Sequence, residues 1–229
     1  MNKAAFIGIS RLRMYTDGHG ITTLVAFHGC PLHCKYCLNP QCLAPSSKVL
    51  KLTAKEVFDI LKKDELYFIA TKGGVTFGGG EPLLNADFIQ DLLEMGANRW
   101  HTTVETSLYV SIEHIKKLEP YIDEYIIDIK DMNPVIYRKY TGQCNSHVVE
   151  NIKWLVDHGK RDNITCRIPL IPKFNSSKDQ EKSISHLKKL GIKRFDIFDY
   201  VTDSKRRHYE RQRKMRTVEA NTQGVSSAE

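Results

Sequence analysis

Short apolar, β-branched segments alternate along the chain with longer segments whose apolar residues recur at helical spacing. This alternation of strand and helix predicts a parallel sheet with helical crossovers. Six such units are too few for a closed eight-stranded barrel, so we expect an α/β fold with an open, partial barrel. The expected strands are 21–28, 74–77, 101–106, 124–129, 163–168 and 194–199, with a further short strand at 4–9. The expected helices are 53–63, 86–95, 111–119, 145–159 and 177–190.

Residues typical of helix ends support several of these boundaries. Thr53 and Glu56 form a capping-box pattern at the start of the first expected helix. Ser111 is expected to cap a second helix at its N-terminus. Gly159 and Gly191 stand where the residue after a helix is often glycine.

A change in composition near residue 203 marks the expected end of the folded domain. Residues 205–216 contain seven Lys or Arg residues and one Glu, so they carry +6 of the chain's formal net charge of +7. We therefore predict one domain over residues 1–204 and a flexible basic tail over 205–229. The domain itself is nearly neutral, so overall basicity does not indicate nucleic-acid binding.

The chain shows no apolar run of the roughly 18–20 residues needed to span a bilayer. Its first ten residues, MNKAAFIGIS, contain no long apolar stretch typical of a secretory signal. We therefore expect a cytoplasmic protein without membrane attachment. In a reducing compartment, the six cysteines are expected to act as ligands or core residues before disulfides.

The strongest chemical signal is the sequence C-P-L-H-C-K-Y-C, which holds Cys30, Cys34 and Cys37 directly after a predicted strand. Parallel α/β folds place their sites at the carboxyl ends of strands. Thiolates at this spacing suit an iron–sulfur cluster or zinc. Three thiolates would leave one iron of a four-iron cluster open to a substrate or cofactor. Zinc would instead need a fourth ligand from His28, His33 or Cys42.

A second signal is the glycine-rich sequence G-G-V-T-F-G-G-G-E-P over residues 73–82. Glycines after a short strand allow a ligand to approach the backbone closely, and Glu81 adds a nearby carboxylate. A tight turn with a surface glutamate is the alternative interpretation.

The Cys-x3-Cys-x2-Cys loop, Tyr36 before its third cysteine and the turn Gly79-Gly80-Glu81-Pro82 resemble the radical S-adenosylmethionine (SAM) superfamily. T-D-G-H-G at 16–20, the motif at 27–40 and I-D-I-K at 127–130 resemble activating enzymes of glycyl radical enzymes, of the pyruvate formate-lyase activating type. The resemblance covers roughly residues 5–200. It implies a partial barrel of six βα units.

The resemblance also implies roles for individual residues. The three cysteines match the ligands of a 4Fe–4S cluster, whose open iron would chelate SAM. The remaining residues matching positions around SAM are Tyr36, whose backbone would contact adenine; Gly79, Gly80 and Glu81, which would receive the methionine amino group; Lys130, which would pair with the carboxylate; and Arg167 on strand 5. A monovalent cation, Na⁺ or K⁺, would be bound by Asp17, Glu105, Thr106 and Asp128.

Several of these residues also have simpler interpretations. Lys130 could pair with Asp128 or a surface acid, Arg167 could form a structural salt bridge, and Asp17 could be only a turn residue. The remaining cysteines, Cys42, Cys144 and Cys166, are interpreted as loop or core thiols.

The sequence departs from the family pattern at five places. His19 stands where proline is usual, and Leu108 replaces a glycine. Glu105 stands in place of the usual aspartate. Asp199-Tyr200-Val201 lacks the histidine that touches the SAM ribose in the family, and the basic tail replaces the usual C-terminal segment.

The function implied by the resemblance is reductive cleavage of SAM to a 5′-deoxyadenosyl radical, which abstracts hydrogen from a glycine of a partner glycyl radical enzyme. A flavodoxin or ferredoxin-type donor would supply the electron, and the enzyme is expected to be a monomer. A radical SAM enzyme acting on a peptide or small molecule is the alternative. A zinc-stabilised module that binds nucleic acid through the basic tail is a more remote one.

Overall fold

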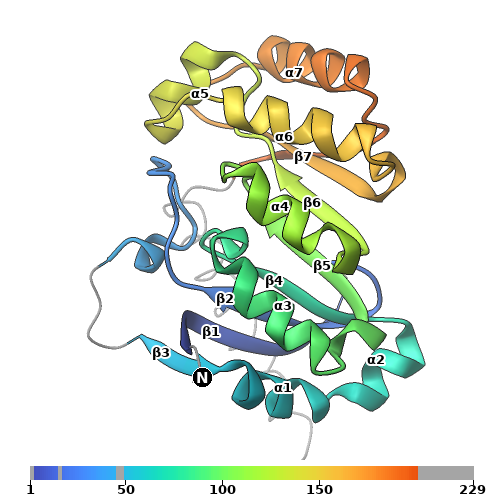
Figure 1. Ribbon diagram of the computed structural model, residues 1–229. Coiled ribbons are helices and arrows are strands. Elements are labelled where there is room, and N and C mark those ends of the chain that lie inside the picture. The colour runs from blue at the N-terminus through green and yellow to red at the C-terminus, as the bar shows by residue number, and fades with distance from the viewer. Residues whose placement is uncertain (1–2, 15–16, 45–48, 201–229) are drawn as a thin grey trace, which may run out of the picture.

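The computed structural model describes residues 3–14, 17–44 and 49–200, which form one eight-stranded sheet (Figure 1). Its strand order is β3-β1-β2-β4-β5-β6-β7-β8. Six strands run parallel from β2 to β8, whereas β1 pairs antiparallel with both β2 and β3. The bounds are β1 Lys3–Met14, β2 Ile21–Phe27, β3 Leu50–Thr53, β4 Gly74–Gly79, β5 His101–Thr106, β6 Glu124–Asp128, β7 Ile164–Leu170 and β8 Arg194–Asp199.

Helices connect the parallel strands and pack along the sheet (Figure 1). The seven α-helices of the described chain are α1 Ala54–Lys62, α2 Glu65–Thr71, α3 Ala86–Glu94, α4 Ile112–Leu118, α5 Pro134–Thr141, α6 Ser146–Asp157 and α7 Ser177–Lys189. Short 3-10 helices cover Pro40–Cys42, Pro82–Asn85, Ala97–Arg99, Glu119–Tyr121 and Arg161–Asn163. The expected α/β fold with an open, partial barrel is confirmed, because the edge strands β3 and β8 do not pair within the described residues.

The structure contains elements that the sequence pattern did not predict. β1 is twice as long as the expected strand at 4–9, because its charged outer half continues to pair with β2. β3, α2 and α5 were not expected. α5 starts at Pro134, and its N-cap Asn133 accepts a hydrogen bond from the Val135 N–H at 2.9 Å. An N-cap and a proline at the first helical position thus begin a helix whose own apolar pattern is weak.

The predicted helix ends are confirmed. Thr53 and Glu56 form both bonds of the capping box, and Ser111 accepts from the Glu113 N–H. Gly159 and Gly191 follow α6 and α7 with φ of +84° and +98°, values at which glycine is favoured.

The larger of two apolar clusters fills the space between the sheet and the helices. Phe27 and Phe77, on the neighbouring strands β2 and β4, are fully buried, and their rings lie 6.2 Å apart. Ile89 and Leu92 of α3 are also fully buried in this core. Burial of such side chains contributes roughly 1.5–3 kcal/mol each, which fixes the strand ends that carry the polar residues.

Two further expectations concern the chain as a whole. The predicted basic tail over 205–229 lies outside the described residues. Across the part of the chain that is described, no helix has the length and apolar character required to cross a bilayer.

Candidate functional site

A cavity of about 580 Å³ opens at the carboxyl ends of the parallel strands. Pockets of roughly 300–1,000 Å³ are usual for cofactor-sized ligands. All but two of the residues assigned from the resemblance line this cavity, the exceptions being Tyr36 and Glu81. Those lining it are Asp17, Cys30, Cys34, Cys37, Gly79, Gly80, Glu105, Thr106, Asp128, Lys130 and Arg167.

The cysteine loop follows β2 and is held from outside by α5. The His33 N–H donates to the Thr141 carbonyl at 2.9 Å, and the Lys35 N–H donates to the Tyr140 carbonyl at 3.1 Å. Both acceptors lie at the C-terminal end of α5, where carbonyl groups lack helical partners. The loop therefore has a defined position before any ligand binds.

The chemistry of the three thiols fits an iron–sulfur cluster. Burial raises the pKa of Cys30 to about 12 and also raises that of Cys34. Such thiols stay protonated at neutral pH unless a metal binds them and displaces the proton. In the described ranges, no three His, Cys, Asp or Glu side chains are grouped to hold a single metal ion. A four-iron cluster takes one thiolate on each of three irons, so the three cysteines of the loop suffice to hold it without a fourth protein ligand.

The glycine-rich turn after β4 is shaped by its neighbours. Gly79 has φ of +96°, and a Cβ there would lie 2.8 Å from the Phe27 nitrogen. A Cβ on Gly80 would lie 2.1 Å from the Gly29 carbonyl oxygen. Only glycine therefore allows the turn to pack against the start of the cysteine loop, and both glycines present backbone to the cavity.

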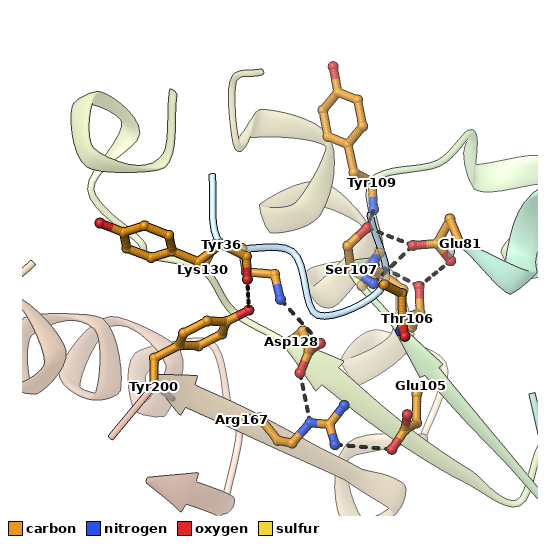
Figure 2. Close-up of polar contacts among 12 residues, drawn as sticks. Tyr36, Glu81, Glu105, Thr106, Ser107, Tyr109, Asp128, Lys130, Arg167 and Tyr200 are labelled. Atoms are coloured by element: carbon orange, nitrogen blue, oxygen red, sulfur yellow. Dashed lines mark hydrogen bonds and ion pairs between the residues drawn. The ribbon is translucent and has the colours of Figure 1, made fainter. Parts of the chain in front are cut away.

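Glu81 is fully buried beneath this turn and does not line the cavity. Its carboxylate accepts hydrogen bonds from the Thr106 hydroxyl at 2.6 Å and from the Ser107 N–H and hydroxyl at 2.9 and 2.6 Å (Figure 2). The Leu83 N–H donates a fourth bond at 3.3 Å. Burial raises the pKa of Glu81, and these hydrogen bonds oppose the rise. Glu81 thus ties the glycine turn to the end of β5.

A chain of alternating charges crosses the cavity wall from β6 to β5 (Figure 2). Lys130 Nζ lies 3.2 Å from Asp128, Arg167 Nε lies 2.7 Å from the same carboxylate, and Arg167 Nη1 lies 3.0 Å from Glu105. Burial alone would raise the pKa of Asp128, but Lys130 and Arg167 outweigh it and bring the pKa to about 2. Lys130 and Arg167 therefore form ion pairs, as their simpler interpretation expected. Both residues also line the cavity.

Arg13 is a cavity residue that the sequence did not reveal. Its Nη2 donates to Asp17 at 3.0 Å, and its Nε also contacts that carboxylate. A register shift between Ser10 and Arg13 interrupts the pairing of β1 with β2, and Leu12 within it has φ of +54°. Because such a bulge breaks the two-residue alternation, the pattern could not show which way Arg13 points.

These ion pairs also involve the carboxylates of the predicted cation site. Asp17 is paired with Arg13, and Glu105 and Asp128 are paired with Arg167. The Thr106 hydroxyl donates to Glu81. The four residues gather at one cavity, and each of the three carboxylates there already has a guanidinium partner.

Tyr200 joins the end of β8 to the cysteine loop. Its hydroxyl donates to the Tyr36 carbonyl, and its side chain lines the cavity (Figure 2). The Tyr36 ring packs edge-on against Tyr140 and Phe174, at centroid distances of 6.2 and 5.6 Å. The stretch that lacks the family's histidine thus carries a phenol that fixes the backbone of Tyr36.

Comparison with known proteins agrees with this geometry. A family model described as the radical SAM superfamily matches residues 24–187. The choline trimethylamine-lyase activating enzyme of Oleidesulfovibrio alaskensis is 27% identical over 80% of this chain and 77% of its own. The pyruvate formate-lyase-activating enzyme of Staphylococcus aureus is 30% identical over 80% of this chain and 76% of its own.

The fold has solved counterparts as well. The crystal structure of Streptococcus suis SuiB bound to precursor peptide SuiA aligns with a TM-score of 0.61 at 18% identity, over 84% of this chain. The match spans only 40% of SuiB, so the likeness concerns the shared domain alone. From the family match over most of the chain and the thiol-lined cavity that it encloses, we conclude that this protein belongs to the radical SAM superfamily.

Proposed function

We propose that this protein is an activating enzyme, which uses a 4Fe–4S cluster and SAM to abstract hydrogen from a glycine of a partner glycyl radical enzyme. The observation that supports it most is the cavity, where three thiols face a glycine turn and a paired lysine. The related activating enzymes, which match 80% of this chain, support the choice of substrate class.

The residues present give each part of the two cofactors a partner. Cys30, Cys34 and Cys37 would hold the cluster, and bound cluster and SAM together supply one-electron chemistry that ends in hydrogen abstraction. Lys130 offers an ammonium group to the SAM carboxylate. Its pKa is raised, since Asp128 outweighs the effect of burial, so Lys130 stays protonated.

The glycine turn has a second role in this proposal. Gly79 and Gly80 offer backbone groups to the methionine amino end of SAM, and Glu81 acts indirectly by holding the turn. Tyr36 offers its backbone to adenine, in a position fixed by Tyr200. The apolar side chains of Leu24, Leu32, Leu38 and Phe198 line the same cavity beside the reacting groups.

The partner proteins follow from the chemistry. A glycine on a mobile loop would have to enter the cavity mouth, because a carbon radical must be released beside its target. A flavodoxin or ferredoxin-type protein would reduce the cluster, and the activating enzyme would act as a monomer.

The test starts with anaerobic reconstitution of the cluster. With dithionite and SAM, the protein should release 5′-deoxyadenosine, and a glycyl radical enzyme encoded beside it should then show a glycine-centred paramagnetic signal. A protein with an intact cluster that never cleaves SAM would contradict the proposal. Cleavage without a glycyl radical on any such partner would favour a peptide or small-molecule substrate.

A matched pair of cysteine variants checks the ligand assignment. Cys34→Ala should lose the broad absorption near 400 nm together with SAM cleavage, because a cluster thiolate is removed. Cys42 also lines the cavity but is buried, with its Sγ 3.7 Å from the Phe27 carbonyl oxygen. Cys42→Ala should therefore keep both properties. Loss of the cluster in Cys42→Ala would show that the ligand set is wrong.

A further inference from the structure

We infer that Arg13 and Arg167 serve as built-in cations of the cavity, so that this protein binds SAM without a monovalent metal ion. The inference rests on the proposed function where it concerns SAM. It is carried by the ion pairs of three carboxylates, Asp17, Glu105 and Asp128.

Each of these carboxylates already has a guanidinium partner. Arg13 contacts Asp17 through two nitrogens, with Nη2 at 3.0 Å. Arg167 bridges the other two, at 3.0 Å to Glu105 and 2.7 Å to Asp128. A guanidinium delivers fixed positive charge with several donors, which is what a bound cation would otherwise offer these oxygens.

The backbone is bent so that one of the arginines reaches the cavity. Leu12 has φ of +54°, an unfavourable value for a branched side chain. It lies within the register shift between Ser10 and Arg13, and pairing resumes with Arg13 opposite Thr22. A strained residue persists only where surrounding contacts hold it. The bend at Leu12 allows Arg13 to pair with Asp17.

The formal charges of the paired groups balance without a metal ion. Three carboxylates, Asp17, Glu105 and Asp128, face three cations, Arg13, Lys130 and Arg167. When Lys130 pairs with the SAM carboxylate, each of the three carboxylates still has its guanidinium partner. A further cation would therefore lack a free carboxylate, and unpaired charge is unfavourable in a partly buried site. Asp196 also lines the cavity, but its side chain is exposed to solvent and has no need of a bound cation to offset burial.

The test compares monovalent salts with the reconstituted wild-type protein. SAM affinity is measured calorimetrically in NaCl, KCl and tetramethylammonium chloride at equal ionic strength. We expect dissociation constants that agree within about twofold. A saturable tightening of about tenfold or more in Na⁺ or K⁺ would overturn the inference.

A second readout does not depend on SAM. The melting temperature of the reconstituted protein should be the same in the three salts, because a specifically bound ion would raise it with concentration. A saturable rise in Na⁺ or K⁺ alone would also overturn the inference. If SAM fails to bind in every salt although the cluster is intact, the proposed function fails, and the melting temperatures still decide the present inference.

Variants of Arg13 test the residue itself. Arg13→Met frees Asp17, so SAM affinity should become dependent on Na⁺ or K⁺ by about tenfold. Arg13→Lys keeps a cation and should remain independent of the salt. Arg99→Met is the matched control, since Arg99 pairs with Glu65 away from the cavity. Arg13→Met with wild-type affinity in all three salts would overturn the role of Arg13.

Discussion

Two carboxylates near the cavity, Glu81 after β4 and Asp128 at the end of β6, are stabilised in opposite ways. Glu81 is fully buried and accepts hydrogen bonds from neutral hydroxyl and amide groups. Asp128 is partly exposed and lies between two cations, Lys130 and Arg167. Neutral donors fix a carboxylate in direction and so position a turn, whereas charged partners set the electrostatic potential of the cavity. Glu81 therefore supports the structure of the site, whereas Asp128 contributes to its charge.

The largest expected effect comes from removing the charge of Asp128. Asp128→Asn leaves Lys130 and Arg167 without their shared partner, so the free energy of unfolding should fall by about 3 kcal/mol. Urea denaturation of the reconstituted protein measures this fall. Asp59→Asn is the control, because its pair with Lys55 is exposed and should change stability by less than about 1 kcal/mol. Equal losses of unfolding free energy in Asp128→Asn and Asp59→Asn would contradict the expected difference between the cavity ion pairs and the exposed one.

A smaller loss is expected when Glu81 loses its charge. Glu81→Gln keeps the shape but places an amide against some of the four donors, so unfolding should become easier by about 2 kcal/mol. Glu94→Gln is the matched control, since Glu94 also accepts from neutral donors but is exposed. If Glu81→Gln weakens SAM affinity without any loss of stability, Glu81 contacts SAM directly.

The pH dependence of stability should differ in sign between the two sites. The pKa of Asp128, about 2, lies below its usual value, so its stabilising effect is complete above about pH 4 and is lost as the pH falls through 2. The advantage of wild type over Asp128→Asn should therefore shrink by about 1 kcal/mol between pH 6 and pH 3.

Glu81 should behave in the opposite way, because burial raises its pKa above the unfolded value. Its contribution is greatest below the unfolded pKa and declines as the pH rises through the folded one. Acidification should thus increase the stability of wild type relative to Glu81→Gln. Parallel pH trends for the two variants would contradict the comparison.

The smallest effect is expected at the end of β8, where the neutral phenol of Tyr200 supports the site. Tyr200→Phe removes the hydrogen bond to the Tyr36 carbonyl and should lower the unfolding free energy by about 0.5–1 kcal/mol. SAM affinity should fall severalfold, while iron content stays unchanged. A reduced iron content would show that Tyr200 supports the cysteines themselves.

Periodicity and capping residues were sufficient to predict the parallel strands and five of the helices. The motifs identified half of the cavity-lining residues, because parallel strands bring their carboxyl ends to one edge. Arg13 escaped prediction because a bulge decides its direction, and a bulge has no periodic signature. The burial of Glu81 also depends on the distant residues Thr106 and Ser107, which sequence spacing alone does not place beside it.

An unclosed sheet also affects the solubility of the protein. Within the described chain, β3 and β8 each pair on one side only, and such edges can recruit strands from other molecules. β3 has only four residues, and half of β8 is charged, with Arg194, Asp196 and Asp199 in six positions. Shortness at one edge and charge at the other oppose aggregation, even though Ile197 and Phe198 are exposed. The fold thereby keeps an accessible cavity without inviting edge-to-edge association.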